Sequence, residues 1–190
     1  MDMQNIKNTH KNTEPAEQWI NFLKTISNSE EHLYMIIDCA HDTRILPALA
    51  KSLNSRCCLF NEENVSETIK AVAPFLVKIK NIDEFVSWCI SEGMHRHWMI
   101  FFTSADQHVS DLRLHFKHFS LAHTPDGKQY FFRYYDARVL PVFITSCEQR
   151  ERDDFFRHCK TIWVPQVSHE GSAQLLQLDI TGAAQVLLNP

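Results

Sequence analysis

Three short, nearly continuous apolar runs constrain the fold of this chain more than any other feature. They are Leu33–Asp38, Phe75–Ile79 and His97–Thr103. Runs of this length, rich in β-favouring residues, are typical of strands buried on both faces. The segments between them carry apolar residues at helical spacing, most clearly over Ile82–Gly93. Strands that alternate with helices predict crossover units, and therefore an α/β fold with a mixed central sheet and flanking helices.

The length of 190 residues indicates one domain with at most a small addition. Residues 1–12 are polar and predict a flexible N-terminal lead-in. A helix is expected to begin near Pro15, since proline is tolerated in the first turn. Residues 13–156 then form the α/β domain, and residues 157–190 a short C-terminal segment, which is a small appendage to it.

Charge and hydropathy exclude several classes of protein. The 19 basic and 23 acidic residues give a formal net charge of −4, whereas binders of nucleic acid or of anionic membranes need a basic surface. The apolar runs are far shorter than the roughly 20 residues of a membrane helix. The first residues carry no secretory signal, and the six cysteines have no disulfide spacing. We therefore expect a cytoplasmic protein with reduced thiols that binds neither nucleic acid nor membrane.

A cysteine and a histidine just past the first apolar run form a candidate catalytic pair. Cys39 and His41 lie two residues apart, beside Asp38 and Asp42. The end of a buried strand is a usual place for catalytic groups in open sheets. A nucleophilic thiolate needs a base within hydrogen-bonding reach. The segment lacks the glycines of a nucleophile turn, so a small Cys-His hydrolase is retained only as an alternative.

Metal and cofactor motifs are not recognisable. The pairs His95/His97 and His115/His118 have ligand-like spacing, but eleven histidines make such pairs unsurprising. Four isolated glycines cannot build a phosphate-binding loop. We expect no metal, no cofactor and no nucleotide chemistry.

The most informative segment is Phe131–Leu140, with the sequence FFRYYDARVL. A turn at Asp126-Gly127 predicts a hairpin whose second strand is Tyr130–Tyr135. Arg133 on an apolar strand needs a partner, which Asp136 can supply while it caps the next helix. The arrangement predicts a structural ion pair at a strand–helix corner, with direct ligand recognition as the alternative.

Segments of the chain occur in the order of a known family's motifs. They are Leu33–Asp38 (LYMIID), Ala73–Val77 (APFLV), Trp98–Ser104, Leu112–Phe116 (LRLHF), the Asp126-Gly127 turn and Phe132–Leu140 (FRYYDARVL). In this order they resemble a domain-of-unknown-function family of adaptor proteins, also called effector chaperones, of the bacterial type VI secretion system. Ala137 stands where that family usually has proline.

The resemblance implies a non-catalytic cytoplasmic adaptor. Such a protein binds a secreted toxin effector and helps to load it onto a VgrG or PAAR spike protein. The motif residues Arg133, Tyr135, Asp136 and Arg138 are then structural or partner-binding. Besides the hydrolase, a second alternative is an immunity-like protein that binds the active site of a toxin.

Overall fold

A central sheet between two layers of helices forms the body of the molecule. The computed structural model describes residues 13–27, 31–60, 65–106, 108–123, 126–168 and 171–188. The predicted lead-in over residues 1–12 lies outside this part of the chain. The strands are β1 (His32–Asp38), β2 (Ser55–Cys58), β3 (Pro74–Ile79), β4 (Met99–Ser104), β5 (Leu121–His123), β6 (Gln129–Phe131), β7 (Ile162–Val167), β8 (Ala173–Leu178) and β9 (Ala184–Leu188).

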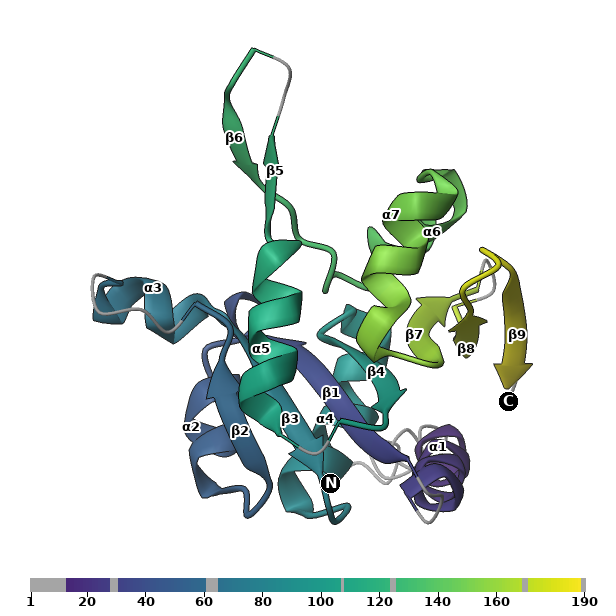
Figure 1. Ribbon diagram of the computed structural model, residues 1–190. Coiled ribbons are helices and arrows are strands. Elements are labelled where there is room, and N and C mark those ends of the chain that lie inside the picture. Colours follow the sequence, from purple (N-terminus) through teal and green to yellow (C-terminus); the bar gives the residue numbers. More distant parts are fainter. Residues whose placement is uncertain are drawn as a thin grey trace, which may run out of the picture.

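Seven α-helices and three short 3-10 helices connect these strands in the described residues (Figure 1). The α-helices are α1 (Thr13–Ser27), α2 (Ile45–Lys51), α3 (Glu67–Val72), α4 (Glu84–Gly93), α5 (Val109–His118), α6 (Leu140–Ser146) and α7 (Gln149–Phe155). The 3-10 helices are η1 (Cys39–His41), η2 (Met94–Arg96) and η3 (Phe156–His158). The helix expected to begin near Pro15 is α1, which begins at Thr13. The helical pattern over Ile82–Gly93 is confirmed as α4, which ends at Gly93.

The strand order of the main sheet is β2-β3-β1-β4-β7-β8-β9. Strand β3 lies between β1 and β2 and is antiparallel to both, so β1 and β2 run parallel and α2 crosses between them. In the same way, α4 joins β3 to β4 across β1. Each crossover skips one strand, which is a split βαβ connection. The α/β class is confirmed. In one respect the sheet differs from the mixed one expected, because all its hydrogen-bonded pairs in the described residues are antiparallel.

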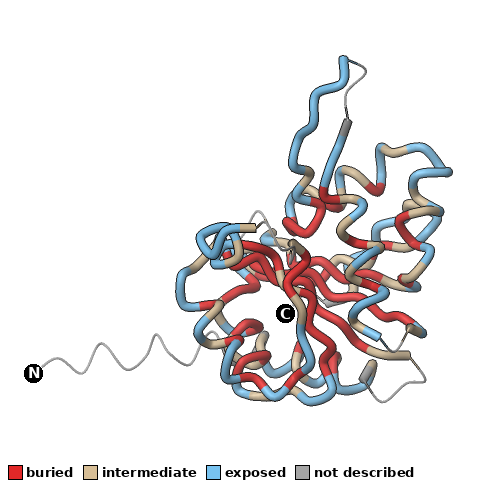
Figure 2. Tube along the Cα trace, turned by 60° about the vertical axis from the view of Figure 1, so that its left-hand side comes forward, coloured by how far each residue is buried: buried red, intermediate tan, exposed pale blue. Residues whose placement is uncertain are grey.

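Successive residues of the central strands point to opposite faces of the sheet and pack into two separate cores. Met35 and Phe101 face α1, α2 and α4, where Trp19 and Leu49 are buried. Tyr34, Ile36 and Phe102 face the opposite layer of α5, α6 and α7, where Phe116 and Phe155 are buried. The period of two along each strand therefore places one helical layer on each face. Figure 2 shows the buried residues following the strands through the middle of the molecule.

The C-terminal segment continues the central sheet. Strand β7 pairs with β4, and β8 and β9 follow as antiparallel neighbours. Two apolar stretches of this segment, whose type the sequence pattern leaves open, are thus strands. Strand β9 lies at one edge of the sheet and β2 at the other.

Two local predictions were wrong. The apolar spacing over Leu46–Leu53 predicts a helix with Leu53 on its buried face, but α2 ends at Lys51 and the Leu53 side chain is 91% exposed. The predicted strand Tyr130–Tyr135 ends at Phe131. The hairpin ladder stops where the Phe132 amide donates to the Ser120 carbonyl, and a turn follows. The short β5–β6 hairpin stands out from the body in both views (Figures 1 and 2).

Candidate functional site

The end of β1 and the segment after the hairpin meet at one site. The Arg133 guanidinium donates through Nη2 to the Asp38 carboxylate, 95 residues away in the chain. The other oxygen of Asp38 accepts from the amide of Ala40 at 3.0 Å, at the start of η1. The predicted ion pair between Arg133 and Asp136 was therefore wrong in its partner. Arg133 does pair with a carboxylate, as expected for a charge among apolar residues. The tertiary structure supplies that carboxylate from Asp38, whereas the local sequence favours Asp136.

Asp136 pairs with Arg138 instead. Its Oδ1 accepts from the amide and Nε of Arg138 at 2.9 and 3.0 Å, and its Oδ2 accepts from Nη2 at 2.6 Å. This is the two-pronged geometry that makes arginine–carboxylate pairs strong. Burial acts to raise the pKa of Asp136, but the hydrogen bonds from Arg138 outweigh it and hold this pKa below its usual range.

The prediction that Asp136 caps the following helix was also wrong. Helix α6 begins only at Leu140, and its N-cap position is Val139. The side chain of Asp136 closes the turn before the helix, and its carbonyl accepts from the amides of Val139 and Leu140. The carboxylate thus holds the corner between the hairpin and α6, as an Asx-type turn does.

The two ion pairs share one asymmetry. The side chains of Asp38 and Asp136 are 1% and 4% exposed, whereas those of Arg133 and Arg138 are 44% and 58% exposed. The negative charges therefore lie inside the protein and the positive ones face solvent. Each buried carboxylate holds the guanidinium in front of it in place.

His41 and Tyr135 complete the site. Nε2 of His41 lies 3.8 Å from Oδ2 of Asp38, is buried, and has no hydrogen-bond partner in the described part of the chain. Burial lowers the pKa of His41, although the charges of Asp38 and Asp136 act in the opposite direction. Burial also raises the pKa of Tyr135 to about 12, and its ring packs edge-on against Tyr134 in the core. Tyr135 thus belongs to the packing of the site, behind its exposed face.

The geometry at Cys39 is unlike that of an activated nucleophile. Cys39 is buried in the core cluster that contains α2 and α4. Burial raises the pKa of its thiol to about 12, whereas catalytic cysteines have a lowered pKa. Within the described residues, no hydrogen bond joins Cys39 to His41, whose imidazole faces Asp38.

His115, one of the histidines with ligand-like spacing, makes contacts within the fold. Nε2 of His115 contacts the Phe155 carbonyl at 3.0 Å, and its ring packs against that of His158. His158 in turn contacts Asp106. Across the described ranges, no group of three or more His, Cys, Asp or Glu side chains is arranged to hold a metal ion.

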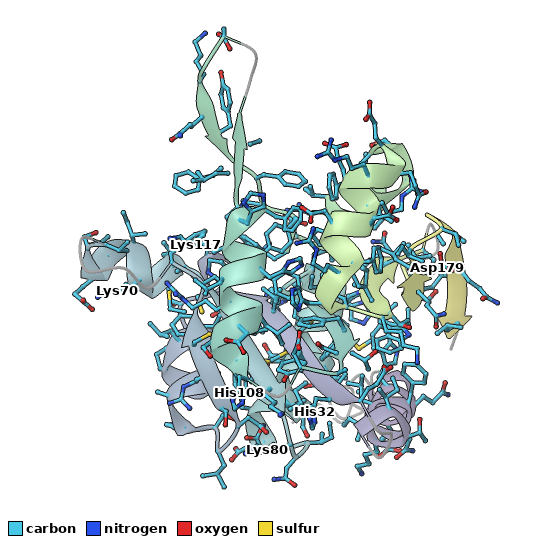
Figure 3. The ribbon with its side chains drawn as sticks, in the orientation of Figure 1. His32, Lys70, Lys80, His108, Lys117 and Asp179 are labelled. Carbon is cyan, nitrogen blue, oxygen red and sulfur yellow. The ribbon has the colours of Figure 1, made fainter. Side chains whose placement is uncertain are left out.

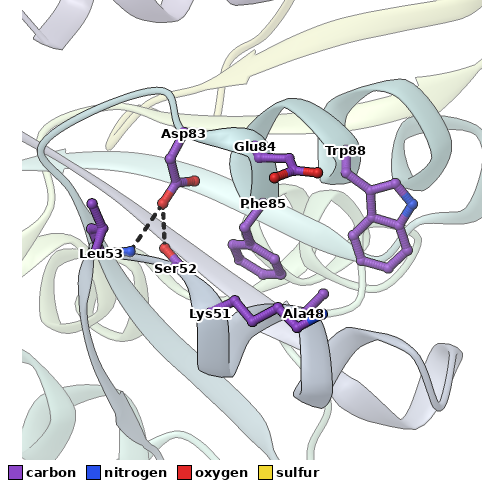
Figure 4. A pocket seen from close by; sticks show the side chains of 8 residues that line it. All are labelled: Ala48, Lys51, Ser52, Leu53, Asp83, Glu84, Phe85 and Trp88. Atoms are coloured by element: carbon purple, nitrogen blue, oxygen red, sulfur yellow. Dashed lines mark hydrogen bonds between the residues drawn. The ribbon is translucent and has the colours of Figure 1, made fainter.

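A hollow lies between the end of α2 and the start of α4, apart from the ion pairs. It has a volume of about 380 Å³, and the rings of Phe85 and Trp88 form its apolar wall (Figure 4). One of its two carboxylates, Asp83, caps α4 through the amide of Val86 and accepts from Ser52 Oγ at 2.6 Å. Because these bonds hold α2 to α4, the carboxylate of Asp83 is engaged in the structure of the fold.

Sequence reasoning missed the role of Asp38. The sequence pattern places Asp38 beside Cys39 and at the end of the LYMIID segment, and it favours Asp136 as the partner of Arg133. A signal was present, because an acidic residue that ends an apolar strand needs a cation or several hydrogen-bond donors when it is buried.

Comparison with known proteins adds a family. The model of a family described as "Domain of unknown function (DUF4123)" matches residues 33–154, well over half of the chain. This range contains both ion pairs of the site and all the segments that carry the resemblance. The chain has no match among curated proteins or among solved structures. Among the described residues, no helix is both long and apolar enough to cross a membrane.

Proposed function

The chain belongs to the DUF4123 family, and from this membership we propose that it is a cytoplasmic adaptor, or effector chaperone, of a type VI secretion system. In this role it binds a toxin effector and helps to load it onto a VgrG or PAAR spike protein, without catalysis. The observation that carries the proposal is the family match over residues 33–154, which covers every motif segment in order.

The chemistry of the site favours binding over catalysis. Both carboxylates are engaged by arginines, and the pKa of the nearest thiol, Cys39, is raised to about 12. A hydrolase would need a base near that thiol and a lowered pKa. Fixed arginines at a surface are, by contrast, common at protein interfaces. These features support an adaptor and weigh against the Cys-His hydrolase.

The test is a deletion of this gene in a strain with an active secretion system. We expect the toxin encoded beside the gene to remain in the cell, while secretion of unrelated effectors continues. Re-expression of the tagged protein is expected to restore secretion and to recover the toxin by affinity purification. Normal secretion of every toxin in the deletion strain would contradict the proposal.

Two further readouts separate the alternatives. Cys39→Ala is expected to restore secretion as well as the wild type does, whereas a hydrolase would lose its activity. An immunity-like protein would protect cells that express the isolated toxin domain. An adaptor that binds the loading region would leave those cells unprotected.

A further inference from the structure

We propose that Arg133, Arg138 and the nearby Phe131 form a docking surface for a polypeptide segment that carries carboxylate side chains among apolar ones. We call these three residues the arginine–aromatic surface. The inference deepens the proposed function and rests on it in one respect, because it assigns the segment to the cargo of the adaptor.

The first support is the fixed and exposed state of the arginines. Arg138 uses Nε and Nη2 for Asp136, and its Nη1 has no hydrogen-bond partner among the described residues. Its side chain is held in one geometry from beneath and is more than half exposed. A guanidinium that is already ordered loses little conformational entropy when a partner carboxylate binds. Because the two acidic partners are buried, an incoming chain would meet the guanidinium groups of the pairs.

The second support is an exposed aromatic ring beside them. Phe131 is 74% exposed, and its ring lies 5.9 Å from that of Phe60. Phe131 and Arg133 alternate with Phe132 and Tyr134, which pack into the core. Exposure alternates from Phe131 to Tyr134, so the Phe131 ring and the Arg133 guanidinium are both turned away from the core. Arginine and aromatic residues are the side chains most enriched in interface hot spots.

The third support comes from the hairpin that carries Phe131. Every residue of β6 is exposed, and the hairpin projects beyond the body of the molecule (Figure 1). Lys117 lies in the last turn of α5, at the end from which the hairpin rises (Figure 3). Large exposed apolar side chains on a projecting element are typical of a binding surface.

The charge balance favours an acidic and apolar polypeptide over a nucleic acid. The whole chain carries a formal net charge of −4, which would repel a polyanion at longer range. Each arginine is already paired with a carboxylate of its own. A polypeptide segment with single carboxylates beside apolar side chains can pair with the two guanidinium groups and pack on the Phe131 ring.

The experiment uses two synthetic peptides and the full chain. One is a fluorescein-labelled amphipathic helix of about 15 residues, with Leu on one face, Gln on the other and two Glu beside the Leu face, and the second has Lys in place of each Glu. Binding is measured by fluorescence anisotropy. We expect the Glu peptide to bind at least about tenfold more tightly than the Lys peptide, and to weaken as salt rises from about 0.05 to 0.5 M.

Variants with matched controls locate the binding. Arg138→Gln and Phe131→Ser are each expected to weaken binding of the Glu peptide by about fivefold or more. Arg150→Gln removes an equal charge from an exposed position on α7, and Leu53→Ser removes an exposed apolar side chain elsewhere. Both controls are expected to bind within about twofold of the wild type. Thermal melting of each variant verifies folding, because Phe131→Ser also removes the ring contact with Phe60.

Three results would overturn the inference. They are undetectable binding of the Glu peptide, equal binding of both peptides, and wild-type affinity in Arg138→Gln and Phe131→Ser. The same variants are then compared with the toxin encoded beside the gene. If the wild type captures no toxin, the proposed function fails whatever the peptides show. If every variant captures it equally, the adaptor function stands and this surface is rejected.

Discussion

The long-range ion pair at the site leads to a quantitative prediction for Asp38→Asn. The Asp38 side chain is 1% exposed and accepts from the Ala40 amide and from Arg133. Asparagine keeps an acceptor for Ala40 but loses the charge that faces the guanidinium. A hydrogen bond to a charged group contributes about 1.5–3 kcal/mol. Since Arg133 is 44% exposed, solvent screening places the expected loss near the lower limit, about 1.5 kcal/mol.

The assay is urea unfolding followed by tryptophan fluorescence. Trp19 and Trp98 are almost fully buried, so their emission will shift when the chain unfolds. A loss of about 1.5 kcal/mol corresponds to a fall in Tm of about 3–6 °C for a chain of this size. A double-mutant cycle with Arg133→Gln is expected to give a coupling energy of about 1 kcal/mol.

A second cycle decides between the two candidate partners of Arg133. The local sequence favours Asp136, whereas the structure pairs Arg133 with Asp38. We therefore expect the cycle of Asp136→Asn with Arg133→Gln to give a smaller coupling energy than the cycle with Asp38. The reasoning would be refuted by a coupling near zero for Asp38, or by a larger one for Asp136.

Three more outcomes follow from buried groups. Gly93→Ala should lower stability by about 1–3 kcal/mol in urea unfolding despite the better helix propensity of alanine, because a Cβ there would lie 2.8 Å from the Trp98 ring. Burial lowers the pKa of His115 below its usual 6.5, so the unfolded chain takes up the proton first. The unfolding free energy should therefore fall as pH drops from about 7 to 5, and fall less steeply in His115→Gln. Because burial raises the pKa of Cys39 to about 12, a thiol reagent at pH near 8 should modify the half-buried Cys147 first in the native protein, as mass spectrometry of the digest would show.

Hydrophobic periodicity determined which segments of this chain become buried strands and which become amphipathic helices. The run at Leu33–Asp38 is β1, and the spacing over Ile82–Gly93 is realised in α4. These patterns are local, because a strand or helix that packs on a core must repeat its apolar residues with its own period. The resemblance of the motif segments to a family likewise depends on local sequence, and the family match over residues 33–154 agrees with it.

Contacts between distant segments were decided only by the tertiary structure. The insertion of β3 between β1 and β2 makes the sheet antiparallel, and no periodic pattern encodes which strands become neighbours. The same packing brings Asp38 at the end of β1 to Arg133, although Asp136 lies closer in sequence. The sequence alone determined that a buried charge here needs a partner, because an unpaired one is costly. Which carboxylate meets that need depends on how the strands and the turn pack together, and this the tertiary structure decided.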